Sequence, residues 1–210
     1  MLFRSPVLQK VIAFSLPLML SSCLQLLFNA ADVIVVGRFA GSTSLAAVGS
    51  TTELLSLLTT LFIGFSIGAN VNVARTLGNQ DDQGTKDGIH TAVSVSILSG
   101  SAMILLGFLF GRPMLQWMGT PADVIDKASL YLMIIFIGMP SNMAYNFGSA
   151  ILRAMGDTKR PLYFLSAAGV LNVVLNLIFV IVLHMDVAGV ALATILSETL
   201  SAVLILNCLC

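Results

Sequence analysis

The residue with the clearest chemical meaning in this sequence is Asp32, a carboxylate inside an apolar segment. The segment covers residues 11–36, and no charged residue precedes Asp32 within it. An ionised carboxylate is costly at membrane depth unless it faces a protein interior, a water-filled cavity or a cation. No Lys or Arg lies within any predicted span, and Arg38 is the nearest cationic residue. We therefore expect Asp32 to bind a proton or a cation. The alternative is that Asp32 pairs with another residue and has only a structural role.

Two pairs of polar residues sit in later apolar segments. Asn172 and Asn176 stand four residues apart, and the same spacing separates Thr194 from Glu198. Residues four apart project from one face of a helix. Their oxygens, with Asp32, suit a proton relay or a hard cation such as sodium, and Glu198 is a candidate secondary acid. The alternative is that the amides and Thr194 only bond neighbouring helices. We expect Asn172 and Asn176 to line the same cavity as Asp32.

Pro17 lies in the same segment as Asp32. A proline inside a helix removes one backbone donor and is expected to kink the helix there. Asp32 follows fifteen residues later, so a change in the bend would move the carboxylate by several ångströms. We hypothesise that Pro17 is a conformational hinge and that protonation of Asp32 favours the bent form. A static kink filled by neighbouring helices is the alternative.

The composition decides which elements carry these residues. The 210 residues are 57% hydrophobic and only 10% charged, and the mean hydropathy is +0.98. Globular domains carry about 25% charged residues, so the sequence predicts an integral membrane protein. Lipid admits only helices or closed barrels, and a helix needs about 20 apolar residues to cross it. The sequence predicts an all-α, polytopic bundle in one lobe with six spans: 11–36, 54–74, 91–110, 128–152, 161–183 and 187–207.

The connections between the spans carry the cationic residues. Residues 75–90 and 153–160 read as polar loops, whereas residues 37–44 and 184–186 read as tight turns. An inside N-terminus puts seven cationic residues in the cytoplasm: Arg4, Lys10, Arg75, Lys86, Arg153, Lys159 and Arg160. The other three would lie outside: Arg38, Arg112 and Lys127. This asymmetry predicts a protein of the cytoplasmic membrane with both termini in the cytoplasm.

Several other classes of function lack support. The balanced charge, ten basic against ten acidic residues, gives no reason to expect a nucleic-acid partner. No cluster has metal-ligand spacing, and no Gly-rich phosphate loop follows a strand. Nucleophile–base arrangements are also absent from the sequence. We expect no enzyme, no metal site and no cofactor; the partners expected are membrane lipids and a small organic molecule.

With these features the sequence resembles the multidrug and toxic compound extrusion (MATE) transporters. Six strings carry the resemblance, in the family's order: IAFSLPLML, NAADVIVVGRFAG, GANVNVARTLG, ILRAMGDTKRP, LNVVLNLIF and VAGVALATILSE. They cover nearly the whole chain and match the N-terminal six-helix lobe of that family. The resemblance implies one lobe of a twelve-helix antiporter. Such an antiporter exports organic, often cationic, compounds against inward proton or sodium flow.

The resemblance also assigns residues. Asp32 matches the first-helix aspartate of the family, and Pro17 matches the proline at which that helix bends. Asn172 and Thr194 match polar residues of the N-lobe cavity, and Tyr131 fits the pattern with weaker functional meaning. Asn176 departs from it, because several members carry aspartate there. That departure argues against a sodium site or a two-carboxylate proton relay in this lobe.

The length leaves alternatives open. A second lobe of similar size is missing, so we expect either a further C-terminal lobe or the pairing of two copies about an axis normal to the membrane. A second function within the same superfamily is a lipid-linked oligosaccharide flippase, which usually shows more basic residues along its cavity. A third interpretation is a membrane fragment or scaffold that does not transport.

Overall fold

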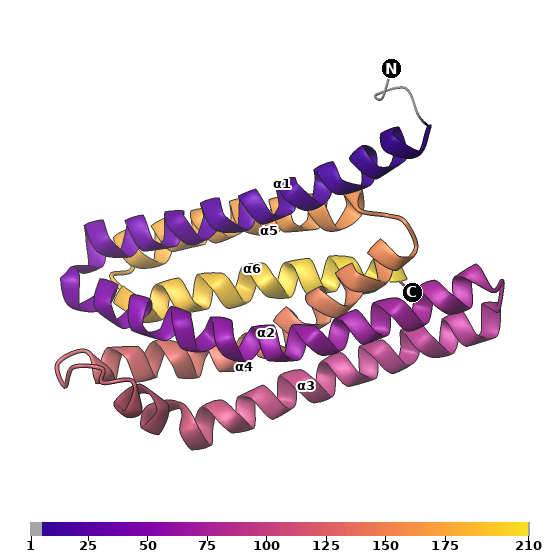
Figure 1. Cartoon of the computed structure of the whole chain (residues 1–210). Coiled ribbons are helices and arrows are strands. Elements are labelled where there is room, and N and C mark those ends of the chain that lie inside the picture. The colour runs from indigo at the N-terminus through magenta and orange to yellow at the C-terminus, as the bar shows by residue number, and fades with distance from the viewer. Residues whose placement is uncertain (1–5, 210) are drawn as a thin grey trace.

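The computed structural model describes residues 6–209, which form a bundle of six long helices without a strand (Figure 1). The elements are α1 (Pro6–Val35), the π-helical turn η2 (Val36–Ala40), α2 (Ser42–Gly78), α3 (Asp82–Trp117), α4 (Ile125–Ala154), α5 (Lys159–Asn176), the π-helical segment η3 (Leu177–Val182) and α6 (Asp186–Leu209). Six helical segments are long and apolar enough to cross a membrane. The predicted class, an all-α polytopic bundle, is confirmed. Arg4, which entered the charge count, lies outside the described residues.

The helices divide into two groups with α6 between them. Helix α4 packs against α2, α3 and α6, whereas α5 packs against α1 and α6. Figure 1 shows the α1–α5 pair on one side of α6 and the α2, α3 and α4 helices on the other. The largest fully buried side chains include Phe136 and Phe147 of α4. Helix α4 is therefore the centre of the packed core, and α1 presents large apolar side chains outward, as a bilayer requires.

Two glycines permit close approach between helices. A Cβ added to Gly100 of α3 would collide with the backbone of Pro140 in α4. A Cβ added to Gly169 of α5 would collide with the ring of Phe28 in α1. Small residues at such contacts let helix backbones pack tightly where lipid provides no hydrophobic drive for association. These contacts fix how α3 meets α4 and how α1 meets α5.

The expected polar loop at residues 75–90 is mostly helical, which corrects the sequence prediction. Helix α2 continues to Gly78 and α3 begins at Asp82, so only residues 79–81 connect them. The side chain of Asp81 accepts a hydrogen bond from the amide of Gly84 at 2.9 Å and caps the start of α3. The helices extend past the apolar stretch because the cap and good helix formers such as Lys86 support them outside lipid.

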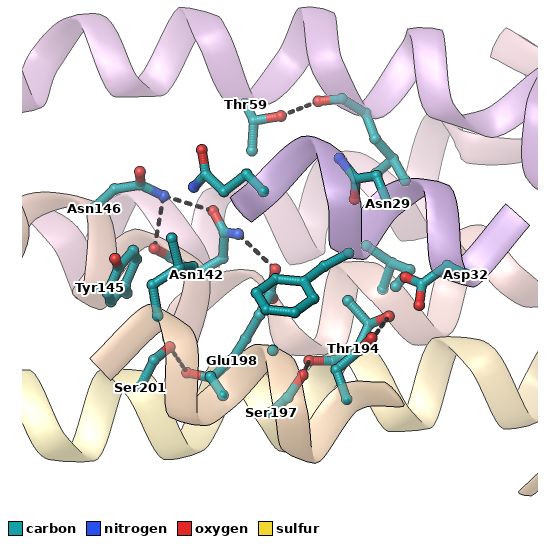
Figure 2. A pocket seen from close by; sticks show the side chains of 18 of the residues that line it. Asn29, Asp32, Thr59, Asn142, Tyr145, Asn146, Thr194, Ser197, Glu198 and Ser201 are labelled. Carbon is teal, nitrogen blue, oxygen red and sulfur yellow. Dashed lines mark hydrogen bonds between the residues drawn. The ribbon is translucent and has the colours of Figure 1, made fainter. Parts of the chain in front are cut away.

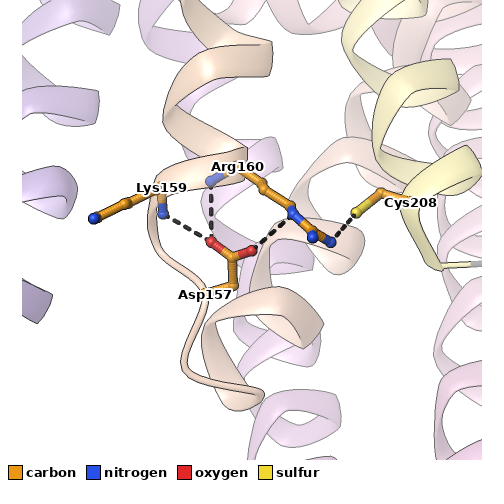
Figure 3. Close-up of polar contacts among 4 residues, drawn as sticks. All are labelled: Asp157, Lys159, Arg160 and Cys208. Carbon is orange, nitrogen blue, oxygen red and sulfur yellow. Dashed lines mark hydrogen bonds and ion pairs between the residues drawn. The ribbon is translucent and has the colours of Figure 1, made fainter.

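The polar segment between α4 and α5 is a short, cross-braced link (Figure 3). The Asp157 carboxylate accepts hydrogen bonds from the amides of Lys159 and Arg160, both at 3.1 Å. Its other oxygen pairs with the Arg160 guanidinium at 3.1 Å, and that guanidinium also donates to the thiol sulfur of Cys208 at 3.1 Å. The side chain of Asp157 thus caps α5, and Arg160 ties this link to the last turns of α6.

Pro17 lies buried within α1, which runs through it as one continuous helix. The proline has no N–H to donate one turn back, to Ala13. Its own carbonyl accepts a hydrogen bond from the Ser21 hydroxyl at 2.9 Å. A local weakening of the backbone at Pro17 follows from this chemistry, and its role as a hinge stays a prediction.

Candidate functional site

Four predicted residues from three helices form one hydrogen-bonded chain. The Asn176 amide donates to the carboxylate of Asp32 across the α1–α5 contact. The same amide nitrogen donates to Asn172 Oδ1 at 3.2 Å, and Asn172 Nδ2 lies 3.4 Å from Thr194 Oγ1 on α6. The Thr194 hydroxyl donates in turn to the carbonyl of Val190 at 3.0 Å. The structure therefore brings together the residues that the sequence placed on separate helices.

The chain of contacts contains an unused acceptor. Asn176 is 1% exposed, and its Oδ1 is buried without a hydrogen-bond partner among the described residues. Asp32, beside it, receives only the Asn176 amide there. A buried acceptor without a donor is costly, and so is a buried carboxylate with a single donor. A proton on Asp32 or a small cation bound beside it would relieve the cost of the carboxylate.

Both helices that carry this pair change geometry next to it. Helix α1 gives way to η2 four residues after Asp32, and α5 gives way to η3 directly after Asn176. The segments η2 and η3 contact each other. A π-helical turn shifts the register of side chains and often marks a functional site. The Asp32–Asn176 pair therefore lies where two helices are irregular together.

A cavity of about 380 Å³ opens beside this pair. Five helices line it, and α3 takes no part: its lining residues fall on α1, α2, α4, α5 and α6. The residues that α6 contributes recur at helical spacing: Thr194, Ser197, Glu198 and Ser201. Figure 2 shows this face of α6 turned toward the amides of α4 and toward Asp32. The volume falls in the range of small-molecule binding sites.

The predicted residues occupy different positions around this cavity. Asp32, Asn172 and Thr194 line it, and so does Tyr131 of α4, which is 8% exposed. Asn176 does not line it, which corrects the expectation that both asparagines would face the cavity. Asn176 is the last residue of the regular part of α5, and its amide points to Asp32 at the α1–α5 contact instead. Pro17 is also absent from the lining.

Glu198 proves to be part of the cavity wall rather than an isolated acid. Its carboxylate accepts a hydrogen bond from Asn142 Nδ2 at 2.8 Å. Asn142 in turn accepts from Asn146 Nδ2, at 2.9 Å through both its side-chain and its backbone oxygen. These two asparagines were not among the residues predicted from the sequence. Their spacing of four residues in an apolar span is the same signal that identified Asn172 and Asn176.

No Lys, Arg or His lines the cavity in the part of the chain described. Across residues 6–209 no group of three or more His, Cys, Asp or Glu side chains could hold a metal ion together. The polar atoms of the cavity are instead two carboxylates, amides and hydroxyls. Such a wall attracts cations and gives an anionic ligand no charged partner.

Two ion pairs lie at the end of the bundle opposite the first turn of α1. Lys127 of α4 donates to Asp186 of α6 at 2.6 Å and to the hydroxyl of Ser44 on α2 at 2.9 Å. Arg112 and Asp126 pair at 2.9 Å near the same end. The first contact joins the starts of three helices that line the cavity.

The sequence is similar to that of known membrane proteins. The MatE family profile matches residues 17–178. The probable multidrug resistance protein YpnP of Bacillus subtilis (strain 168) is 34% identical over 196 residues, which are 91% of this chain and 43% of YpnP. The multidrug export protein MepA of Staphylococcus aureus (strain MRSA252) is 25% identical over 95% of this chain and 44% of MepA.

Solved structures agree with these matches. A crystal structure of MATE in the bent conformation superposes with a TM-score of 0.88 at 28% identity, over 97% of this chain and 45% of that one. An outward-facing multidrug resistance MATE transporter gives a TM-score of 0.89 over 95% and 44%. This chain thus spans less than half the length of the relatives it matches. With a six-helix bundle, a cavity lined by two carboxylates and a family match over most of its length, the chain belongs to the MATE (multidrug and toxic compound extrusion) family of transporters.

Proposed function

We propose that this chain is the N-terminal lobe of a cation-coupled antiporter that exports organic, often cationic, compounds across the cytoplasmic membrane. The observation that carries the proposal is the contact of Asp32 with Asn176 beside a cavity that no described basic residue lines. The names of the relatives, a multidrug resistance protein and a multidrug export protein, agree with such a substrate class.

Asp32 is the proposed coupling residue. Its ionised form is costly in the apolar bundle, so a proton or a cation stabilises it there. Asn172, Asn176 and Thr194 supply the neighbouring oxygens. The coupling ion is a proton or sodium, and a single carboxylate at this position favours the proton, because sodium sites gain affinity from additional charged ligands.

The cavity supports the export of cations over the flipping of lipid-linked oligosaccharides. A lipid-linked oligosaccharide carries phosphate groups, which need cationic or backbone donors. The wall offers amides and hydroxyls but no Lys or Arg among the residues described. The observed wall therefore suits a positively charged organic molecule better.

A second lobe completes the proposed transporter. Its source is either a further six-helix lobe or a second copy of this chain, since six spans leave both ends on one side of the membrane. The cavity opens between helix groups, and a second lobe facing it would enclose the substrate. An antiporter needs such a closed and re-opened cavity to alternate access.

The test is ethidium efflux from energised cells that express the chain alone or together with the C-terminal lobe of a MATE relative. We expect efflux that depends on the ion gradient, and the isosteric change Asp32→Asn should reduce it to the level of empty-vector cells at equal membrane abundance. Asp123→Asn, the same change on an exposed loop residue, is the matched control. Collapsing the proton gradient or the sodium gradient separately identifies the ion.

Two results would contradict the proposal. Wild-type efflux rates in the Asp32→Asn variant would remove the coupling role of this carboxylate. Equal ethidium retention in wild-type, Asp32→Asn and empty-vector cells, under both expression conditions, would favour the interpretation of a membrane scaffold that does not transport.

A further inference from the structure

Glu198 is the second carboxylate of the cavity and takes no part in the contacts of Asp32. It lies on α6, which begins at Asp186, so it sits roughly 18 Å along the helix at 1.5 Å per residue. Thr194, the last member of the Asp32 chain, is one helical turn nearer to the start of α6, about 6 Å away along the axis. The two carboxylates thus occupy different depths of one cavity, and Glu198 is at the middle of the span.

A relay of side chains orients this carboxylate. Asn146 donates to the oxygen of Asn142, which fixes the Asn142 amide with its nitrogen toward Glu198. Figure 2 shows Asn146, Asn142 and Glu198 in line across the cavity. The relay serves only one carboxylate oxygen, Oε1. In the described chain the other oxygen, Oε2, receives no hydrogen bond from a side chain or from the backbone.

Within residues 6–209 the charge of Glu198 also has no counterion. The ion pairs of the described residues join Arg112 to Asp126, Lys127 to Asp186 and Arg160 to Asp157. None of them involves Glu198. A carboxylate at membrane depth that has one amide donor and no cation is unfavourable unless it takes up a proton or a ligand supplies the missing charge.

Aromatic side chains complete the surroundings. Phe28, Tyr131 and Tyr145 all line the cavity with Glu198. The hydroxyl of Tyr145 donates to the carbonyl of Pro161 at 3.1 Å, which holds the ring in place. An aromatic face attracts a desolvated organic cation, and attracts it more strongly when a carboxylate is near.

We propose that Glu198 binds the positive charge of the organic substrate, in a site built from Glu198, Asn142, Asn146 and the aromatic wall. The ligand class is a bulky organic cation of the ammonium or phosphonium type. This inference rests on the proposed function and deepens it by dividing two tasks: Asp32 carries the coupling ion, and Glu198 recognises the substrate.

The test is equilibrium binding to the purified full chain in lipid nanodiscs, without any ion gradient. The probes are tetraphenylphosphonium and its uncharged relative triphenylphosphine oxide, measured by calorimetry. Glu198→Gln keeps the shape and removes the charge, so we expect the Kd for tetraphenylphosphonium to rise about tenfold or more. The Kd for triphenylphosphine oxide should stay within about twofold, because an uncharged ligand loses no ion pair. Asp123→Asn is the control and should change neither value.

A second variant tests the relay. Asn142→Leu removes the donor to Glu198 while preserving the approximate volume of the side chain. We expect a smaller rise in the Kd for tetraphenylphosphonium than with Glu198→Gln and no change for triphenylphosphine oxide. A purely structural role would weaken both probes together.

Three outcomes would overturn the inference: no saturable binding of tetraphenylphosphonium by the wild-type chain, an unchanged Kd in Glu198→Gln, or equal weakening of both probes. The measurement needs no transport, so it stays separate from the efflux test of Asp32. Normal charge-selective binding with no Asp32-dependent efflux would retain this site and reject the coupling role.

Discussion

Asn176 faces Asp32 with its amide and keeps a buried carbonyl oxygen without a partner in the described chain. Changing it to aspartate would place two carboxylates in contact, and these cannot both be ionised without a proton or a cation between them. We therefore expect Asn176→Asp to create a sodium-sensitive site. Sodium chloride should raise the Tm of this variant in detergent by several degrees relative to choline chloride, and should leave the wild type nearly unchanged. Equal responses in both proteins would show that the oxygens do not converge on a cation.

Asn172 and Asn176 have different surroundings. Both side chains are buried, at 5% and 1% exposure, but Asn172 lines the cavity, whereas Asn176 lies at the helix contact outside the cavity lining. In a background with the native cysteines replaced, we expect Asn172→Cys to react with a small water-soluble thiol reagent and Asn176→Cys to react at least about tenfold more slowly, as buried thiols do. Tetraphenylphosphonium should slow the reaction at position 172. Equal labelling of the two positions would contradict the arrangement described for the end of α5.

The contact of α3 with α4 depends on Gly100. Gly100→Ala would force the new methyl group against the backbone of Pro140, which has no freedom to move aside. We expect a loss of about 1–3 kcal/mol in the free energy of unfolding, measured as a lower Tm. Gly64→Ala is the matched control, since Gly64 lies in a helix with nothing within 4 Å of the added Cβ. Both changes gain the same helix propensity, so the difference between them isolates the clash.

The effect expected of Pro17 is on the bend of α1 as a whole. If the weakened backbone lets α1 change its bend, Pro17→Ala should leave folding intact but slow ethidium efflux several-fold and flatten its pH dependence. Removing the proline restores one helical hydrogen bond and stiffens the helix. Pro113→Ala in α3 is the control, another proline inside a helix. An unchanged pH profile in Pro17→Ala would mean that the proline has a structural role and is not a hinge.

The two ends of the bundle differ in the number of cationic residues. In Figure 1 the first turn of α1, the α2–α3 turn, the α4–α5 link and the last turn of α6 lie together at one end. Six cationic residues lie in or next to these parts: Lys10, Arg75, Lys86, Arg153, Lys159 and Arg160. The opposite end has Arg38, Arg112 and Lys127. The positive-inside rule therefore predicts that the first end is cytoplasmic.

Reporter fusions measure this orientation directly. A fluorescent protein fused after Cys210 should fluoresce in bacterial cells, and alkaline phosphatase inserted at Ala122 should be active, because that loop would face the periplasm. The reverse pattern, with a dark C-terminal fusion and an inactive insertion, would invert the predicted topology.

Periodicity and composition alone determined the class of this protein. A chain with so few charges must satisfy its backbone within helices when it lies in lipid, so six apolar stretches imply six spanning helices. Asp32 and the paired asparagines of α5 stood out for the same reason: a polar group at that depth has a high cost and needs a partner. Helix ends were less predictable, because the cap at Asp81 and the favourable residues that follow it extend α2 and α3 beyond the apolar stretch.

Which polar residues meet depends on the packing of the helices. The spacing of Asn172 and Asn176 put both on one face of α5, where they contact each other; the packing of α1 against α5 sets Asp32 against Asn176 and leaves Asn172 to the cavity. The partner of Glu198 is 56 residues away in sequence, on a helix selected by the packing of α4 against α6. Local patterns fix the direction of a side chain on its own helix, whereas the partner across the gap depends on how the helices pack together.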